Sequence, residues 1–282
     1  MLECIPIEII KEIMNYLEDF EYTIMTFVSK KWKCFKTKQI NKKSFMNLVA
    51  KSGHLNLVQW AHQNNCSFDE NTTANAACGG SIEVLEWLKN YGCKWNESTC
   101  LEAAKNGHLD ILIWARLYGC SWDFRVGFLA ADGGYLNIIK WIYDNGYQHQ
   151  LHIYCCAAQN GHLDIIQWLK SNYYEFGTTA CDYAIIGGHF EIVKWLCENG
   201  CKPDADTFAV AAANDRLDIV IYLKNNGYQW DSESCYSAAV NGNFDMLKWL
   251  LTNGCPYNSQ IYLASDQYPN IRTWLEENQY QR

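Results

Sequence analysis

Small, aromatic and apolar residues recur along most of the chain at a fixed interval of 27 residues. Each interval contains a small residue, an aromatic residue seven positions later, and a Cys or Tyr six positions after that. The small residues are Gly53, Gly80, Gly107, Gly134, Gly161, Gly188, Asp215 and Gly242. The aromatic residues are Trp60, Trp87, Trp114, Trp141, Trp168, Trp195, Tyr222 and Trp249. Eight units in phase, without insertion or deletion, predict a solenoid.

Each unit is expected to fold as two short helices. Asn96 or Ser98 can cap a first helix that ends at Gly107, where Gly takes a left-handed conformation. A second helix is expected to begin at Leu109 and to end at Gly119. This reading predicts short connectors between paired helices.

Three further columns of the repeat predict how the helices pack. Asp215 replaces the turn Gly in one unit, and Asp tolerates a positive φ better than most residues. An Ala-Ala pair, such as Ala103-Ala104, precedes most of the turns and predicts a seam where neighbouring helices approach closely. The Trp column is expected to fill the larger gap between second helices.

The pattern Ala-Ala-x-Asn-Gly-His-Leu-Asp-Ile-Ile-x-Trp-Leu-x-x-x-Gly resembles the helix-turn-helix core of ankyrin repeats. The resemblance implies an all-α, ankyrin-like solenoid over residues 41–282, with about nine units. Ankyrin units have about 33 residues, so these shorter units leave room for only a tight connector, and almost no β structure is expected. The last unit is irregular, because Trp274 follows Trp249 by 25 residues and Pro269 interrupts it. We expect it to cap the stack.

Residues 1–40 do not follow the 27-residue interval. They begin with Ile5-Pro6-Ile7-Glu8-Ile9, continue with Ile13-Met14-Asn15-Tyr16-Leu17 and close with Val28-Ser29-Lys30-Lys31-Trp32. These segments resemble the F-box, a helical motif that docks onto the Skp-type adaptor of cullin–RING ubiquitin ligases. The resemblance implies an adaptor-binding surface made of Ile5, Pro6, Ile9, Ile13, Leu17, Val28 and Trp32. The alternative is that residues 1–40 form only a helical cap, with their apolar face buried near Phe45 and Val49.

Composition and charge limit the classes of partner. The 282 residues are 49% hydrophobic and 19% charged, which favours a folded chain. No run of 18 apolar residues occurs and the start lacks a secretory pattern, so we expect no membrane span and a cytoplasmic protein. The net charge of −8 argues against nucleic acid as a partner. A lysine-rich run from Lys30 to Lys43 leaves the nucleus as an alternative location.

The residues that often carry chemistry mostly follow the repeat. Eight of the 14 Cys lie in two repeat columns, where we expect them to be small buried hydrophobes, and His54, His108, His162 and His189 all lie at turns. One group departs from this pattern, because His149 and His152 precede Cys155-Cys156 with a spacing that suits zinc. Cys155 would point away from a face shared by His152 and Cys156, so a structural role is favoured there too. No catalytic residue, metal or cofactor is predicted.

Partner-binding residues are expected where units differ while the framework stays constant. The variation is greatest just before and within the first helices of the middle units, and ankyrin-like stacks line their concave face with these helices. The candidates are Phe124, Arg125, Phe128, Leu151, His152, Asp182, Tyr183 and Ile186. The alternative is that these side chains only pack the first helices against each other.

Together these features predict a non-catalytic substrate receptor of a cullin–RING ubiquitin ligase, with a target protein held by the repeats. The pairing resembles F-box and ankyrin proteins of amoebae and their giant viruses, where a viral version would redirect host ubiquitination in the host cytoplasm. The alternative is an ankyrin scaffold, or an inhibitor of host proteins, with no ligase link. An enzyme is the third and weakest class.

Overall fold

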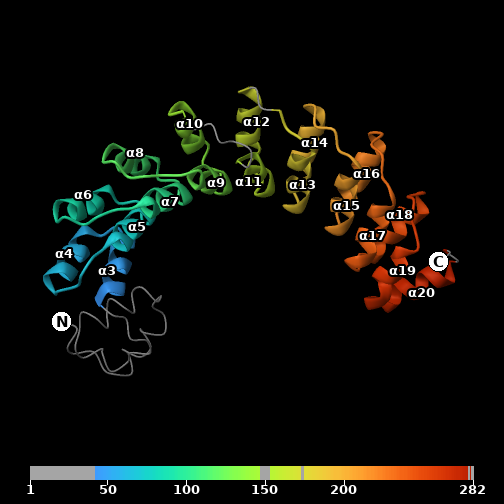
Figure 1. Cartoon of the computed structure of the whole chain (residues 1–282), viewed down its shortest axis with the longest axis horizontal. Coiled ribbons are helices and arrows are strands. Elements are labelled where there is room, and N and C mark those ends of the chain that lie inside the picture. Colours follow the sequence, from blue (N-terminus) through green and yellow to red (C-terminus); the bar gives the residue numbers. More distant parts are fainter. Residues whose placement is uncertain (1–41, 147–152, 173–174, 279, 281–282) are drawn as a thin grey trace, which may run out of the picture. The chain divides into compact units, whose positions relative to one another are not determined.

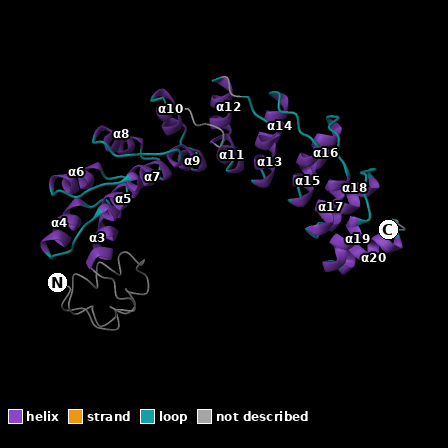
Figure 2. Cartoon of the chain, in the orientation of Figure 1, coloured by secondary structure: helices purple, strands orange, loops and turns teal. Residues whose placement is uncertain are grey.

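The computed structural model describes residues 42–146, 153–172, 175–278 and 280. Helices are the only regular elements in these residues, with 18 α-helices, one 3-10 helix and no strand (Figures 1 and 2). The predictions of an all-α solenoid and of strand-free connectors are therefore confirmed over this part of the chain. The predicted helical module of residues 1–40 lies outside the described residues.

The chain divides into two compact units, and the division at Val126–Gly127 falls inside one helix, α9 (Arg125–Asp132). The first unit holds α3 (Lys42–Lys51), α4 (Leu55–Gln63), α5 (Glu70–Cys78), α6 (Ile82–Asn90), α7 (Glu97–Lys105) and α8 (Leu109–Leu117). The second unit begins with α10 (Leu136–Asp144), α11 (Ile153–Gln159), α12 (Leu163–Ser171), α13 (Thr178–Ile186), α14 (Phe190–Glu198) and α15 (Ala205–Ala213). It continues with α16 (Leu217–Asn225), α17 (Ser232–Val240), α18 (Phe244–Thr252), α19 (Gln260–Ala264), the 3-10 helix η3 (Ser265–Gln267) and α20 (Pro269–Glu277).

The helix ends lie where local chemistry places them. The side chain of Asn96 accepts a hydrogen bond from the amide of Ser98 at the start of α7, so Asn96, not Ser98, is the N-cap. Asp215 has a φ of 54°, as expected for the residue that replaces the turn Gly. Pro269 starts α20 instead of only breaking the repeat, because the first turn of a helix needs no amide donor there.

The Ala pairs form the predicted seam. Ala76, Ala77, Ala103 and Ala104 have no exposed surface, and their helices α5 and α7 lie side by side (Figure 1). The same holds for Ala211 and Ala238 on α15 and α17 of the second unit. Small side chains at these positions let the first helices of consecutive repeats pack closely.

The Cys columns are buried, as expected, and they also donate hydrogen bonds. The Sγ of Cys120 lies 3.0 Å from the carbonyl oxygen of Asn96, and the Sγ of Cys255 lies 3.3 Å from that of Asp231. In both cases a thiol after the second helix ties the connector to the residue that caps the first helix. The two columns also meet, since the Sγ atoms of Cys181 and Cys201 are 2.8 Å apart.

The turn His residues connect one repeat to the next. The Nε2 of His108 lies 3.2 Å from the carbonyl oxygen of Cys78, and because a carbonyl only accepts, this nitrogen carries the proton. The His108 ring lies directly over Gly80, where an added Cβ would be 2.6 Å from Cε1. The His therefore satisfies a carbonyl at the end of the preceding first helix, and the Gly leaves room for its ring.

The aromatic column lies between second helices, as predicted, and it also packs on the connectors. Tyr143 of α10 contacts Trp168 of α12 edge to face, at 5.2 Å between ring centroids. Trp95, in the connector before α7, packs edge to face on Trp114 of α8 at 5.7 Å. The Trp residues thus fill the space between second helices, and Trp114 holds the connector before α7 against α8.

Candidate protein-interaction surface

The first helices have one face turned away from their second helices. On α13 this face holds Asp182, Tyr183 and Ile186, whose spacing of three and four residues places them on one side of the helix. The adjacent Ala184 and Ile185 are fully buried. The positions equivalent to Tyr183 and Ile186 are half-buried or exposed on every described first helix, so they form a surface outside the core.

In the second unit this surface carries an apolar stripe. Ile186, Ala213 and Val240 are 27 residues apart on α13, α15 and α17, which lie side by side in that order (Figure 1). Ile186 is 47% exposed and Val240 is 43% exposed. Tyr183 and Val210 lie one turn earlier on their helices and are half-buried. We call these five residues the α13–α17 stripe.

Acidic side chains accompany the stripe. Asp182, Asp206 and Glu233 lie on the three helices, and the caps Asp204 and Asp231 precede α15 and α17. The sequences of α13, α15 and α17 contain no Lys, Arg or His. The three helices that carry the stripe therefore present acidic side chains and no basic ones.

Asp182 shows the effect of this clustering. Burial raises the pKa of its carboxyl, and the nearby Asp204 and Asp206 carboxylates add to the rise, while the Thr207 hydroxyl acts in the opposite direction. Within the described residues, the buried Oδ1 of Asp182 has no hydrogen-bond partner. The carboxylate is therefore held in a site that stabilises its charge poorly.

The corresponding surface of the first unit is polar. It contains a hollow of about 480 Å³ between α3, α5 and α7. The hollow is lined by Lys51, Asn71, Ala74, Asn75, Cys78, Ser98, Glu102, Lys105 and Asn106. Lys51, Cys78 and Lys105 occupy the same repeat position as the exposed aliphatic residues of the second unit.

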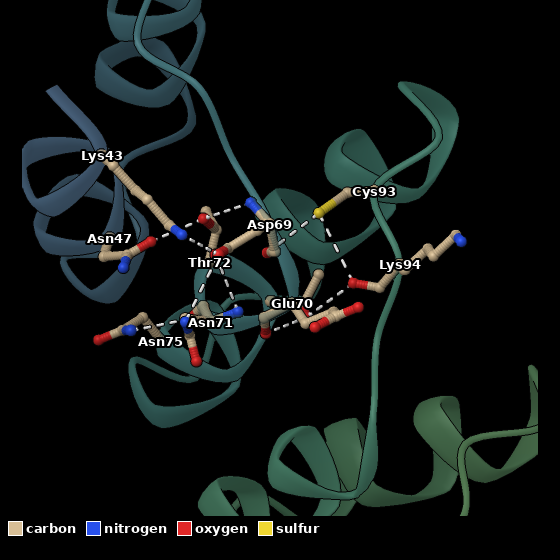
Figure 3. Close-up of polar contacts among 10 residues, drawn as sticks. Lys43, Asn47, Asp69, Glu70, Asn71, Thr72, Asn75, Cys93 and Lys94 are labelled. Atoms are coloured by element: carbon tan, nitrogen blue, oxygen red, sulfur yellow. Dashed lines mark hydrogen bonds and ion pairs between the residues drawn. The ribbon is translucent and has the colours of Figure 1, made fainter.

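A network around Asp69 joins two consecutive repeats beside this hollow (Figure 3). The Asp69 carboxylate caps α5 through the amide of Asn71 and pairs with Lys43 of α3 at 2.5 Å. The hydroxyl of Thr72 donates to Asn47 of α3 at 2.6 Å. The carbonyl of Asp69 accepts from the thiol of Cys93 at 3.2 Å. The acid at this cap is thus neutralised within the fold.

Two of the predicted partner-binding residues lie at the start of α9, in the first unit. Phe124 is 52% exposed. The Arg125 guanidinium pairs with Asp123 at 2.7 Å and with Glu97 at 3.0 Å, and these anions raise its pKa above the usual range. Arg125 is thus occupied by ion pairs within its own unit.

The other candidates belong to the second unit. The structure brings Asp182, Tyr183 and Ile186 together on α13, and Phe128 is half-buried. Leu151 and His152 lie outside the described residues. Val210, Val240, Asp206 and Glu233 were not predicted from the sequence. One repeat column changes from Lys105 to Val240, and this change was the available signal.

The adaptor-binding candidates Ile5, Pro6, Ile9, Ile13, Leu17, Val28 and Trp32 also lie outside the described residues.

The remaining chemical candidates were Cys and His residues. His149 and His152 of the suggested zinc group lie outside the described residues, and within the described ranges no three metal-binding side chains gather. Burial raises the pKa of Cys155 to about 11, and it raises that of Cys93 to about 11 with help from Asp69 and Glu70. Both thiols are protonated at neutral pH, which suits hydrogen-bond donors.

Comparisons with known proteins agree with this architecture. Residues 2–44 match the F-box domain, and residues 128–207 match ankyrin repeats in three copies. The ankyrin repeat domain of human ASB11 has a similar fold, with a TM-score of 0.52 at 19% sequence identity. That alignment covers 65% of this chain and 98% of the ASB11 domain. A comparison with curated proteins gives no match.

The chain therefore contains an F-box domain followed by ankyrin repeats, and both predicted resemblances are confirmed. These two modules support a protein-interaction adaptor. Among the described helices, none is long and apolar enough to cross a membrane.

Proposed function

We propose that this protein is the substrate receptor of a cullin–RING ubiquitin ligase, with the F-box docking a Skp-type adaptor and the first-helix surface holding a target protein. The proposal rests on the direct succession of an F-box match and a helical repeat stack. The F-box match ends at residue 44, within α3, which is the first described helix of the stack. A receptor of this kind raises the concentration of the target near the ubiquitin-charged enzyme. Its own residues then need no catalytic role, and it acts in the cytoplasm, or in the host cytoplasm if the chain is viral.

Adaptor binding tests this proposal directly. We would titrate the full-length protein with a purified Skp-type adaptor by calorimetry, beside a Pro6→Ala/Leu17→Ala variant and an Ile186→Ser control on the repeats. We expect a Kd at or below about 1 µM, lost in the Pro6/Leu17 variant and retained in the control. Circular dichroism must show equal helix content in all three proteins.

A scaffold or inhibitor without a ligase link is the second candidate. The exposed apolar stripe on the described repeats supports it, since a partner could bind there without the F-box. No adaptor binding by a folded sample, tested against adaptors from the matching host, would favour this candidate and remove the ligase role.

A further inference from the structure

We infer that the α13–α17 stripe binds a basic, amphipathic segment of the partner protein, with aliphatic or aromatic side chains on the stripe and Lys or Arg beside Asp206 and Glu233. The inference rests on the proposed target-binding role of the repeats and names the chemistry of the target. It requires no enzymatic step.

The apolar residues of the stripe are not demanded by the solenoid. The same repeat position holds Lys51 and Lys105 in the first unit, where α3, α5 and α7 pack in the same manner. Ile186 and Val240 nevertheless keep 47% and 43% of their surface exposed. With half-buried Tyr183, Val210 and Ala213 between and beside them, these two side chains form a continuous apolar stripe across three helices, and exposed apolar patches mark docking sites.

The charge of this surface selects the partner. In the first unit, the equivalent cap Asp69 pairs with Lys43, and Glu97 pairs with Arg125. Among the described residues of the second unit, no ion pair involves Asp206 or Glu233, and α13, α15 and α17 contain no basic residue. Acids left uncompensated around an apolar stripe favour a cationic segment and repel an anionic one.

The spacing of the stripe suits a helical segment. Packed helices have axes about 8–10 Å apart, and seven residues of an α-helix span about 10.5 Å. A helix laid across α13, α15 and α17 would place side chains seven residues apart over successive members of the stripe. The short side chain of Ala213, between Ile186 and Val240, gives the central position the most room.

A peptide selection tests the inference. We would immobilise the full chain and select from a display library of random peptides of about 16 residues, which span about 24 Å as a helix. Enriched peptides are then measured against a charge variant, Asp182→Asn/Asp206→Asn/Glu233→Gln. The matched control, Asp164→Asn/Glu191→Gln/Asp245→Asn, removes three exposed acids from second helices of the same unit.

We expect the enriched peptides to carry at least two Lys or Arg together with apolar residues at helical spacing. The charge variant should bind them about tenfold more weakly and the control within about twofold, because exposed charge pairs each contribute modestly. Raising the ionic strength from about 0.05 to about 0.5 M should weaken binding more for the natural protein than for the charge variant.

Three outcomes would overturn the inference. They are enrichment of acidic or neutral peptides, equal binding by the charge variant, and no enrichment over an Ile186→Ser/Val240→Ser variant. Adaptor titration of the same samples separates the two proposals. If the protein still binds the adaptor but gives any of these outcomes, only the proposed partner chemistry is refuted. If it binds basic peptides specifically but does not bind the adaptor, only the ligase role is refuted.

Discussion

The contact between a turn Gly and the His ring of the next repeat gives a quantitative prediction for Gly80→Ala. Gly80 has a φ of 77°, and a Cβ there would lie 2.6 Å from Cε1 of His108. Gly92 has a φ of 76°, and no heavy atom among the described residues lies within 4 Å of a Cβ at that position. Gly92→Ala is therefore a matched control that keeps the backbone cost and removes the steric cost.

Both substitutions strain the folded backbone and reduce the freedom of the unfolded chain, and these two effects act on stability in opposite directions. A left-handed Ala costs about 1–2 kcal/mol, and the stiffer unfolded chain returns about 0.4–1 kcal/mol. Gly92→Ala is thus expected to destabilise by about 1 kcal/mol. Gly80→Ala must also displace His108, and leaving the Cys78 carbonyl unpaired costs about 1–2 kcal/mol more. We expect a total of about 2–3 kcal/mol.

Urea unfolding followed by circular dichroism measures both values, with an unchanged m-value as the condition for comparing them. The double variant Gly80→Ala/His108→Ala should lose about 1–2 kcal/mol less unfolding free energy than the two single variants lose together, because the clash is absent once the ring is removed. Equal costs at Gly80 and Gly92, or strict additivity in the double variant, would refute the steric argument.

Three further predictions concern single side chains. Cys120→Ala should cost about 1–2 kcal/mol, since the Asn96 carbonyl loses its donor, and Cys120→Ser should cost less by thermal melting because a donor remains. Burial acts to raise the pKa of Asp69, but Lys43 and two backbone amides outweigh it and hold the pKa below its usual value. Asp69→Asn should therefore destabilise at neutral pH, and the difference should vanish as pH falls through the native pKa of Asp69. Burial and neighbouring carboxylates raise the pKa of Asp182. Asp182→Asn should therefore stabilise the protein at neutral pH and lose this gain near pH 3, below the unfolded pKa of about 3.9. Melting temperatures measured over a pH series test both variants, and a change of the opposite sign would contradict the pKa shift assigned to Asp69 or to Asp182.

The framework was predictable because its causes are local or periodic. A positive φ at Asp215 follows from the turn itself, and the burial of Ala103-Ala104 follows from their recurrence at one phase of the repeat. The donor roles of His108 and Cys120 were not predictable in this way. Their acceptors lie 30 and 24 residues earlier in the chain, and only the stacking of helices shows which carbonyl each side chain reaches.

The candidate surface was found only in part, for a related physical reason. Asp182, Tyr183 and Ile186 differ clearly from neighbouring units, so variation along the chain selects them. Val240 was missed because an aliphatic residue near a helix end resembles a core residue until its exposure of 43% is known. Its contrast with Lys105, five repeats earlier on the equivalent helix, carried the information.

A pair of adjacent residues decides whether this surface serves recognition or only packing. Ile185 is fully buried and Ile186 is 47% exposed, so the same Ile→Ala change probes both environments on one helix. Ile185→Ala is expected to cost about 2–5 kcal/mol. Ile186→Ala should cost about 1 kcal/mol or less, because it removes only partly buried surface and leaves no closed cavity. Urea unfolding of both variants measures the difference, and an equal loss at the two positions would mean that the first helices use Ile186 to pack against each other. A small loss at Ile186 would show that its exposed side chain contributes little to the stability of the fold, as a role in binding requires, at a position where two other repeats have Lys51 and Lys105.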